Sequence, residues 1–145
     1  MPKIKIFLWQ IYHNALPVRG SLLKRGCNVD PMCPLFLNDL ESIEHLFWAC
    51  PGVGAVWVLA AQHQWIPQVQ DNRLIDWGQF LFGMHTRFPG KIIQRITFLL
   101  WGIWKARNGL IFQSEQFNPL KCLIRTKSLS AQWCIRTCVS VDTFL

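Results

Sequence analysis

Two cysteines and a histidine, at positions 33, 45 and 50, constrain this chain more than any other feature of its sequence. A structural zinc site normally has four Cys or His ligands, two of them close in sequence and two more beyond a short spacer. In that pattern Cys33, His45 and Cys50 would be three ligands. The position expected for the remaining ligand is occupied by Phe36, whose side chain cannot bind a metal.

Cys27 is the candidate for the missing ligand, because it lies six residues before Cys33 across a turn-forming segment. The resulting Cys3His set consists of Cys27, Cys33, His45 and Cys50. Two alternatives stay open. The first is that Cys27 is simply a small buried residue, as free cysteine usually is. A zinc ion with water at the fourth position would be catalytic if Glu41 or Glu44 acted as a general base.

The composition indicates a folded chain without disulfides. Its 145 residues fit one domain, or a small module with a helical extension, and about half of them are apolar, with eight Trp and ten Phe. The most apolar run, 96–104, is far shorter than the roughly 20 residues of a membrane span, and no signal peptide is recognisable. We therefore expect a nuclear or cytoplasmic protein with no membrane partner, whose six Cys are thiols or metal ligands.

Apolar residues recur at helical spacing through most of the chain, and no segment has the alternation of a strand. The expected helices cover 2–14, 18–25, 41–50, 53–64, 74–84, 91–112 and a last segment from 118 towards 138. Within the first helix we expect Trp9 to pack in the core, not to stack on a base. Asn108-Gly109 is expected to end or fray the long helix, and Asn118-Pro119 to begin the last one.

The predicted fold class is all-α, with short helices around a Cys/His loop followed by two longer C-terminal helices. We expect three segments along the chain. They are a metal-binding module over 1–65, a linker with a short helix over 66–90, and a basic helical extension over 91–145. On the last helix Cys122, Cys134 and Cys138 are expected to be core thiols, because no His lies near them in the sequence.

The net charge of +7 is concentrated in the last part of the chain. Residues 1–86 hold six Lys or Arg against six Asp or Glu, whereas residues 87–145 hold nine against two. Clustered basic charge favours a polyanionic partner such as RNA or DNA, although a solvated helix face has the same composition. The candidate phosphate contacts are Lys91, Arg95, Lys105, Arg107, Lys121 and Arg125.

Several short motifs together resemble the zinc-binding region of reverse transcriptases from plant non-LTR (LINE-type) retrotransposons. The motifs over roughly the first 60 residues are Phe7-Leu-Trp9, Leu16-Pro-Val-Arg19, Leu23-x-Arg-Gly26, Cys33-Pro-Leu35, Glu41-Ser42, His45-Leu-Phe47, Cys50-Pro51 and Val56-Trp57. Downstream, Trp101-x-Ile-Trp-Lys-x-Arg-Asn108 and Phe112 resemble the segment that precedes an RNase H-like domain in such polyproteins.

The resemblance implies an α-helical zinc module, carboxy-terminal to a polymerase core, that helps to hold the nucleic acid template. It assigns metal ligands to Cys33, His45 and Cys50, and it places the family's second Cys at Phe36, where this sequence departs from the pattern. Other parts of a retrotransposon polyprotein are the implied protein partners.

The sequence does not favour an enzyme. No Asp-Asp pair for polymerase metal ions occurs, and the last 59 residues hold only Glu115 and Asp142 as carboxylates for a nuclease site. We expect a non-enzymatic, nucleic-acid-associated module that is a fragment or relic of a longer element. The alternative is a vestigial or protein-interaction helical domain that binds neither metal nor nucleic acid.

Overall fold

The computed structural model describes residues 2–68, 83 and 88–142, apart from the side chains of 135 and 137–142. Its elements are α1 (Pro2–Tyr12), α2 (Arg19–Lys24), a π-helical turn η1 (His45–Ala49), α3 (Pro51–Gln62), α5 (Gly90–Gln113) and α6 (Pro119–Asp142). Within the described ranges the only β-type pairing is an isolated bridge between Met32 and Leu40. The predicted all-α class is therefore confirmed.

The helices end where local chemistry favours it, with one exception. Gly26 after α2 has a positive φ of 86°, which glycine adopts readily, and Asn118 caps α6 by accepting the Lys121 N–H at 3.0 Å. Ser114 after α5 has a φ of 53°, a conformation less favourable for a residue with a side chain. The predicted bounds 91–112 agree with α5 to within one residue at each end, but the helix continues through Asn108 and Gly109 to Gln113, so the expected end or fraying there is wrong. A glycine inside a helix costs only about 1 kcal/mol, and Gly109 is buried.

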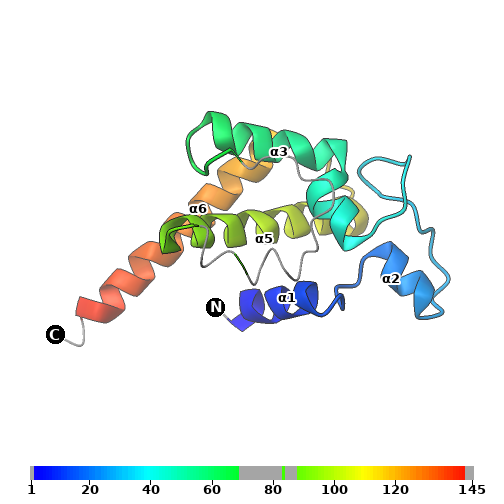
Figure 1. The fold of residues 1–145 in the computed structure, drawn as a ribbon, viewed down its shortest axis with the longest axis horizontal. Coiled ribbons are helices and arrows are strands. Elements are labelled where there is room, and N and C mark those ends of the chain that lie inside the picture. The colour runs from blue at the N-terminus through cyan, green and yellow to red at the C-terminus, as the bar shows by residue number, and fades with distance from the viewer. Residues whose placement is uncertain (1, 69–82, 84–87, 143–145) are drawn as a thin grey trace.

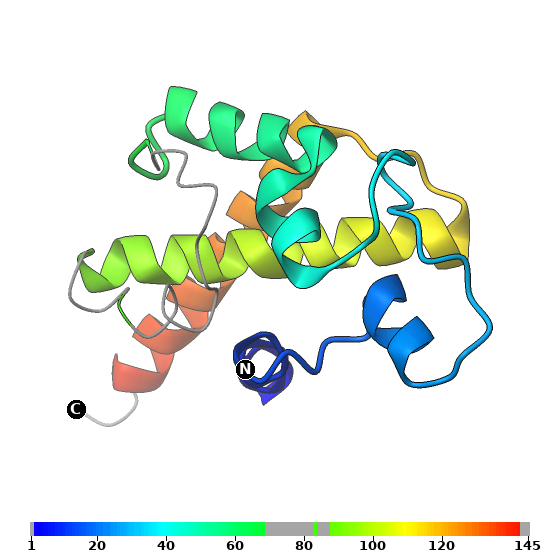
Figure 2. The same cartoon turned by 45° about the vertical axis from the view of Figure 1, so that its right-hand side comes forward.

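The long helix α5 runs through the middle of the molecule, with α1 on one side and α3 on the other (Figure 1). Helix α6 crosses α5 and also packs against α3, while η1 packs against α3. Figure 2 shows the same order from a second viewpoint, with the loop between α2 and η1 near the C-terminal, yellow end of α5. No helix within the described residues is both long and apolar enough to cross a membrane.

A buried cluster of the described residues joins α1, η1, α3, α5 and α6. It includes Phe7 of α1, Phe47 of η1, Leu99 and Ile103 of α5, and Leu123 of α6. The core thus draws on both the first and the last of the predicted segments. The predicted division at 65 and 90 stays a prediction, and the short helix expected over 74–84 lies almost wholly outside the described residues.

Helices α5 and α6 touch closely at Gly102. A Cβ atom added to Gly102 would overlap the hydroxyl of Thr126. Thr126 is fully buried, and its hydroxyl donates to the Cys122 carbonyl at 2.8 Å. This crossing requires a residue without a side chain at position 102.

The helix predicted over 41–50 is wrong in its first part. Ser42 is not helical, and the helical turn begins only at Ile43. The backbone N–H of Glu41 donates to the Pro31 carbonyl at 2.9 Å, and its carbonyl accepts the Gly20 N–H at 2.9 Å. These bonds hold Glu41 between the loop at Pro31 and helix α2, so its backbone is not available for a helix.

The side chain of Glu41 is fully buried and forms the central polar contact of the fold. Its Oε1 accepts the Arg19 N–H at 2.7 Å. The Arg107 guanidinium donates to Oε1 at 2.6 Å and to Oε2 at 3.0 Å. One carboxylate therefore connects the first turn of α2, the loop and α5.

Arg107 is buried, so its predicted role as a phosphate contact is wrong. Only 3% of the residue is exposed, and its guanidinium lies 4.7 Å from the centre of the Trp104 ring. Its donors are used by Glu41 and by the Asn108 side chain. The helical periodicity that predicted an outward position did not account for the buried carboxylate opposite it.

We expect Arg107→Leu to lower the free energy of unfolding by about 3–5 kcal/mol, because the Glu41 charge would stay buried without its partner. Urea unfolding followed by circular dichroism measures the change. The matched control is Arg125→Leu, because Arg125 is 3.6 Å from Glu115 in an exposed pair, and such a pair is worth below about 1 kcal/mol. Equal losses for the two variants would contradict the central role of Glu41.

Candidate metal centre

The loop between α2 and η1 closes on itself and brings Cys33 inward. The Cys33 N–H donates to the Asp39 carbonyl at 2.8 Å, next to the bridge between Met32 and Leu40. The Arg19 guanidinium supports the loop by donating to the Met32 carbonyl at 2.9 Å. Cys33 is fully buried as a result.

The π-helical turn brings together His45 and Cys50, which are five residues apart in the sequence. In an α-helix, residues five apart do not share a face. Here the Cys50 N–H donates to the His45 carbonyl at 2.7 Å, which is the i to i+5 bond of a π turn. The wider turn brings Cys50 back beside His45, and Cys50 then adopts an extended conformation as the N-cap of α3.

Backbone N–H groups lie beside both cysteine sulfurs. Cys33 and Cys50 are both followed by proline. The backbone N–H groups of Leu35 and Phe36 hydrogen-bond the Cys33 sulfur, and those of Val53 and Gly52 hydrogen-bond the Cys50 sulfur. Such N–H donors stabilise thiolates, and they are typical of the outer shell of a metal site.

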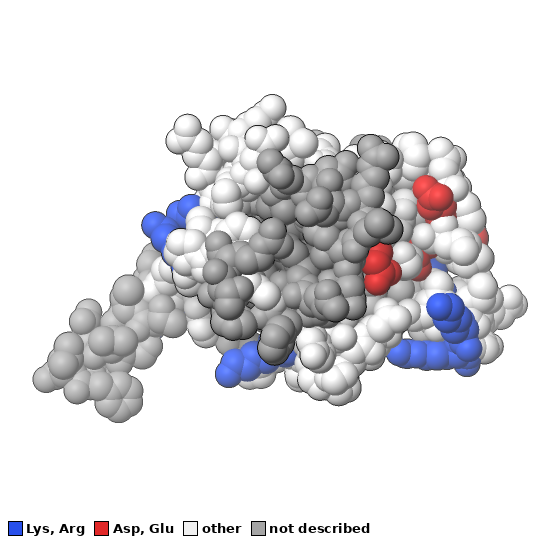
Figure 3. Space-filling view, viewed as in Figure 1, with Lys and Arg blue, Asp and Glu red and all other residues white. Residues whose placement is uncertain are grey.

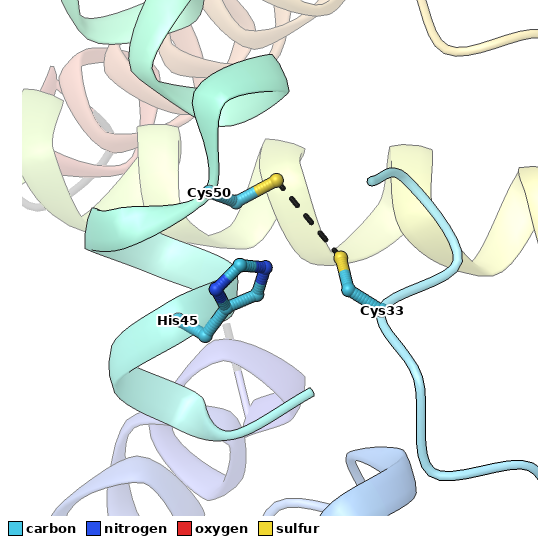
Figure 4. A group of neighbouring side chains, drawn as sticks. All are labelled: Cys33, His45 and Cys50. Carbon is cyan, nitrogen blue, oxygen red and sulfur yellow. Dashed lines mark hydrogen bonds between the residues drawn. The ribbon is translucent and has the colours of Figure 1, made fainter. Parts of the chain in front are cut away.

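The three side chains converge on one point (Figure 4). The Cys33 and Cys50 sulfurs are 3.9 Å apart, and one ligand atom from each of Cys33, His45 and Cys50 lies within 4.8 Å of the others. Two thiolates bound to one tetrahedral zinc at 2.3 Å would be roughly 3.8 Å apart. The separation of the sulfurs therefore fits a shared zinc ion.

His45 supplies the strongest sign of a missing partner. It is buried, and within the described part of the chain its Nε2 is the one buried side-chain nitrogen or oxygen without a hydrogen-bond partner. An unsatisfied buried polar atom costs about 1–3 kcal/mol. The other ring nitrogen, Nδ1, lies 4.0 Å from the carboxylate of Asp39. This separation is too long for a hydrogen bond, so the Asp39 carboxylate acts on the ring only through its charge.

The two thiols titrate as a pair. Their shared hydrogen bond lowers the pKa of Cys50, which the Val53 and Gly52 N–H groups lower further. The same hydrogen bond, together with burial, raises the pKa of Cys33. A dication that binds both sulfurs would therefore have to displace the proton that the two thiols share.

The structure does not bring Cys27 or Phe36 into this group of ligand atoms. Cys27 is exposed and lies outside the group, and the Phe36 side chain is 39% exposed. Of the two candidate general bases, Glu41 is held by Arg107 and by the Arg19 N–H, whereas Glu44 is exposed.

The remaining cysteines differ from one another. Cys122 is buried in the core, as expected, and burial raises its pKa to about 11. Cys134 is exposed and accepts a hydrogen bond from the Gln94 amide at 3.5 Å, so its prediction as a core thiol is wrong. The side chain of Cys138 lies outside the described residues.

Five of the six predicted phosphate contacts lie at least partly at the surface. Lys91, Lys105 and Lys121 are exposed. Arg95 is half-buried and donates to the Trp65 carbonyl at 2.7 Å. Arg125 is exposed beside Glu115, whose carboxylate competes with a phosphate for the guanidinium.

Residues 1–57 match the model of a protein family described as zinc-binding in reverse transcriptase. The match contains the whole Cys33, His45 and Cys50 group, so the predicted resemblance to a reverse-transcriptase zinc region is confirmed for this part of the chain. No curated protein and no solved structure matches the sequence. The plant and LINE-type origin stays a prediction.

Sequence reasoning missed two features of this centre. Asp39 was not singled out, because only the folded loop brings it near His45. The second feature is the set of backbone N–H groups beside each sulfur, for which the Cys-Pro pairs at 33–34 and 50–51 were the available signal.

We expect the purified chain to bind cobalt(II) with a sulfur-to-metal charge-transfer band that Cys33→Ser or His45→Ala removes. Cys27→Ser is the matched control, because Cys27 is exposed and outside the ligand group. Its spectrum should be that of the wild type. Loss of cobalt binding in Cys27→Ser would instead make Cys27 the fourth ligand.

We expect Phe36→Cys to tighten zinc binding by roughly 100-fold, because each ligand of a four-ligand site contributes about 3 kcal/mol. The Phe36 N–H already faces the Cys33 sulfur, so position 36 lies beside the centre. Competition with a chromophoric chelator measures the affinity. Leu37→Cys, one residue further along the exposed loop, is the control and should have no effect. Equal tightening by both variants would show that the added thiol acts without the predicted geometry.

Proposed function

We propose that this chain is a non-enzymatic module that binds zinc through Cys33, His45 and Cys50 and associates with nucleic acid. The observation that carries the zinc assignment is the unpartnered Nε2 of buried His45 beside two sulfurs 3.9 Å apart. The match of residues 1–57 to a reverse-transcriptase zinc region supports the same conclusion.

The three ligands fit a structural zinc better than a catalytic one. All three are buried, and the candidate base Glu41 is fully buried in its contact with Arg107. When bound, zinc would join the loop that carries Cys33 to the η1 turn and the start of α3. It would thereby fix the path of the chain between α2 and α3.

Nucleic-acid association is supported by charge and by resemblance. The chain carries a net charge of +7, and Lys91, Lys105 and Lys121 present exposed ammonium groups on α5 and α6. We further propose, from the sequence motifs, a relic or fragment of a plant non-LTR retrotransposon, with other parts of such a polyprotein as partners and a nuclear or cytoplasmic location. RNA and DNA are both candidate ligands.

We expect binding to a labelled single-stranded oligonucleotide to weaken as salt rises. Replacing Lys91, Lys105 and Lys121 together by Gln should reduce the slope of log K against log salt by about 2, since each lost phosphate contact removes about 0.7. Fluorescence anisotropy from low to moderate salt measures both slopes. The matched control is Glu44→Gln, which removes an exposed negative charge and should not reduce the slope. A wild-type affinity that does not change with salt would refute the phosphate contacts and favour the protein-interaction alternative.

A further inference from the structure

Helix α1 uses one face to join the core. Ile4, Phe7 and Ile11 are buried, and the Phe7 ring packs against the rings of Trp101 and Phe47, with centroid distances of 5.2 and 6.0 Å. These contacts fix the orientation of α1 against α5. The residues on the opposite face are therefore held towards solvent by a rigid helix.

That opposite face is formed by large side chains that do not pack in the core. Trp9 is 58% exposed, Tyr12 is 50% exposed and Ile6 is 59% exposed, and Lys5 and His13 are exposed beside them. The prediction that Trp9 packs in the core is wrong, because the buried stripe of α1 runs through Phe7 instead. Exposed neighbouring apolar side chains commonly mark a binding surface.

The aromatic rings on this face contact one another. The Trp9 and His13 ring centroids are 4.6 Å apart with planes inclined at 43°, and the Tyr12 and His13 rings meet edge to face at 5.0 Å. Lys5, Trp9 and Tyr12 follow each other at steps of four and three residues, so they lie along one line of about 10 Å on the helix. The result is a short row of stiff, exposed rings that continues from a lysine.

Positive charge lies at both ends of this row. Lys3 and Lys5 occupy the first turn of α1, a helix without an acidic residue, although the helix dipole disfavours cations there. Beyond the other end, exposed Arg25 donates to the Ala15 carbonyl at 3.1 Å, next to exposed Lys24. Figure 3 shows Lys and Arg side chains along the lower edge, where Figure 1 places α1 and α2, whereas the acidic side chains of this view lie above it.

We propose that the exposed face of α1, with Trp9 and Tyr12 at its centre, stacks the bases of single-stranded nucleic acid, while Lys5 and Arg25 contact the backbone. This proposal rests on the nucleic-acid association proposed above. Exposed aromatic rings beside basic groups are the two components of single-strand binding surfaces. A duplex would not suit this face, because its bases are already stacked on each other.

The charge of this face favours nucleic acid over an apolar protein partner. A docking surface for an apolar peptide needs no cations, whereas this row is flanked by four of them, Lys3, Lys5, Lys24 and Arg25.

The test compares variants that separate ring stacking from apolar area. Trp9→Leu keeps an apolar side chain and removes the aromatic plane, and Trp9→Phe keeps the plane. For a labelled oligothymidylate we expect Trp9→Leu to weaken binding by roughly 10-fold or more, and Trp9→Phe to retain most of the affinity. The salt slope should not change in either variant, whereas Lys5→Gln should lower it by about 0.7.

The matched control is Phe112→Leu, which removes an exposed aromatic ring from the end of α5 and should leave the affinity unchanged. If the wild type binds but Trp9→Leu and Tyr12→Leu both bind equally well, the stacking site is refuted while the nucleic-acid association stands. If the wild type binds neither single strands nor duplexes, the proposed association itself fails. If Trp9→Leu changes only self-association in sedimentation, the face is a protein interface and the proposal is overturned.

Discussion

Glu41 and Arg107 bring opposite charges into the interior, where a charge is tolerated only if it is paired and hydrogen-bonded. The carboxylate meets this requirement by accepting two donors from Arg107 and one from the backbone of α2. Gly20 allows α2 to come close, because a side chain there would meet the Glu41 carbonyl. The position of α2, the path of the loop and the register of α5 all depend on this one side chain.

The same interior also contains two of the three candidate metal ligands. Cys33 and Cys50 belong to the buried cluster that also contains Phe47 and Leu99, so apolar packing holds two sulfurs at the separation that zinc requires. A site with three protein ligands gains less from the metal than a site with four. The polar contact at Glu41 and the shared core stabilise the loop independently of the ion.

The helices could be predicted from sequence because apolar periodicity and turn chemistry are local. The expected start at Asn118-Pro119 is that of α6, and the predicted bounds 91–112 differ from those of α5 by one residue at each end. Apolar periodicity gave the wrong positions for Arg107 and Trp9. It shows which residues share one face of a helix, but not which side chain of another element faces them. Arg107 is buried because it pairs with the Glu41 carboxylate, and Phe7 of α1 packs in the core whereas Trp9 does not.

The sequence by itself determined the helical class, the three candidate ligands and the surplus of positive charge, since each follows from residue identity and short spacing. Only the tertiary structure decided that His45 and Cys50 meet through a π turn, that Cys27 stays outside the ligand group, and that Glu41 binds Arg107 from 66 positions away. These outcomes depend on contacts between distant segments. Their energies come from desolvation and packing, which no local pattern records.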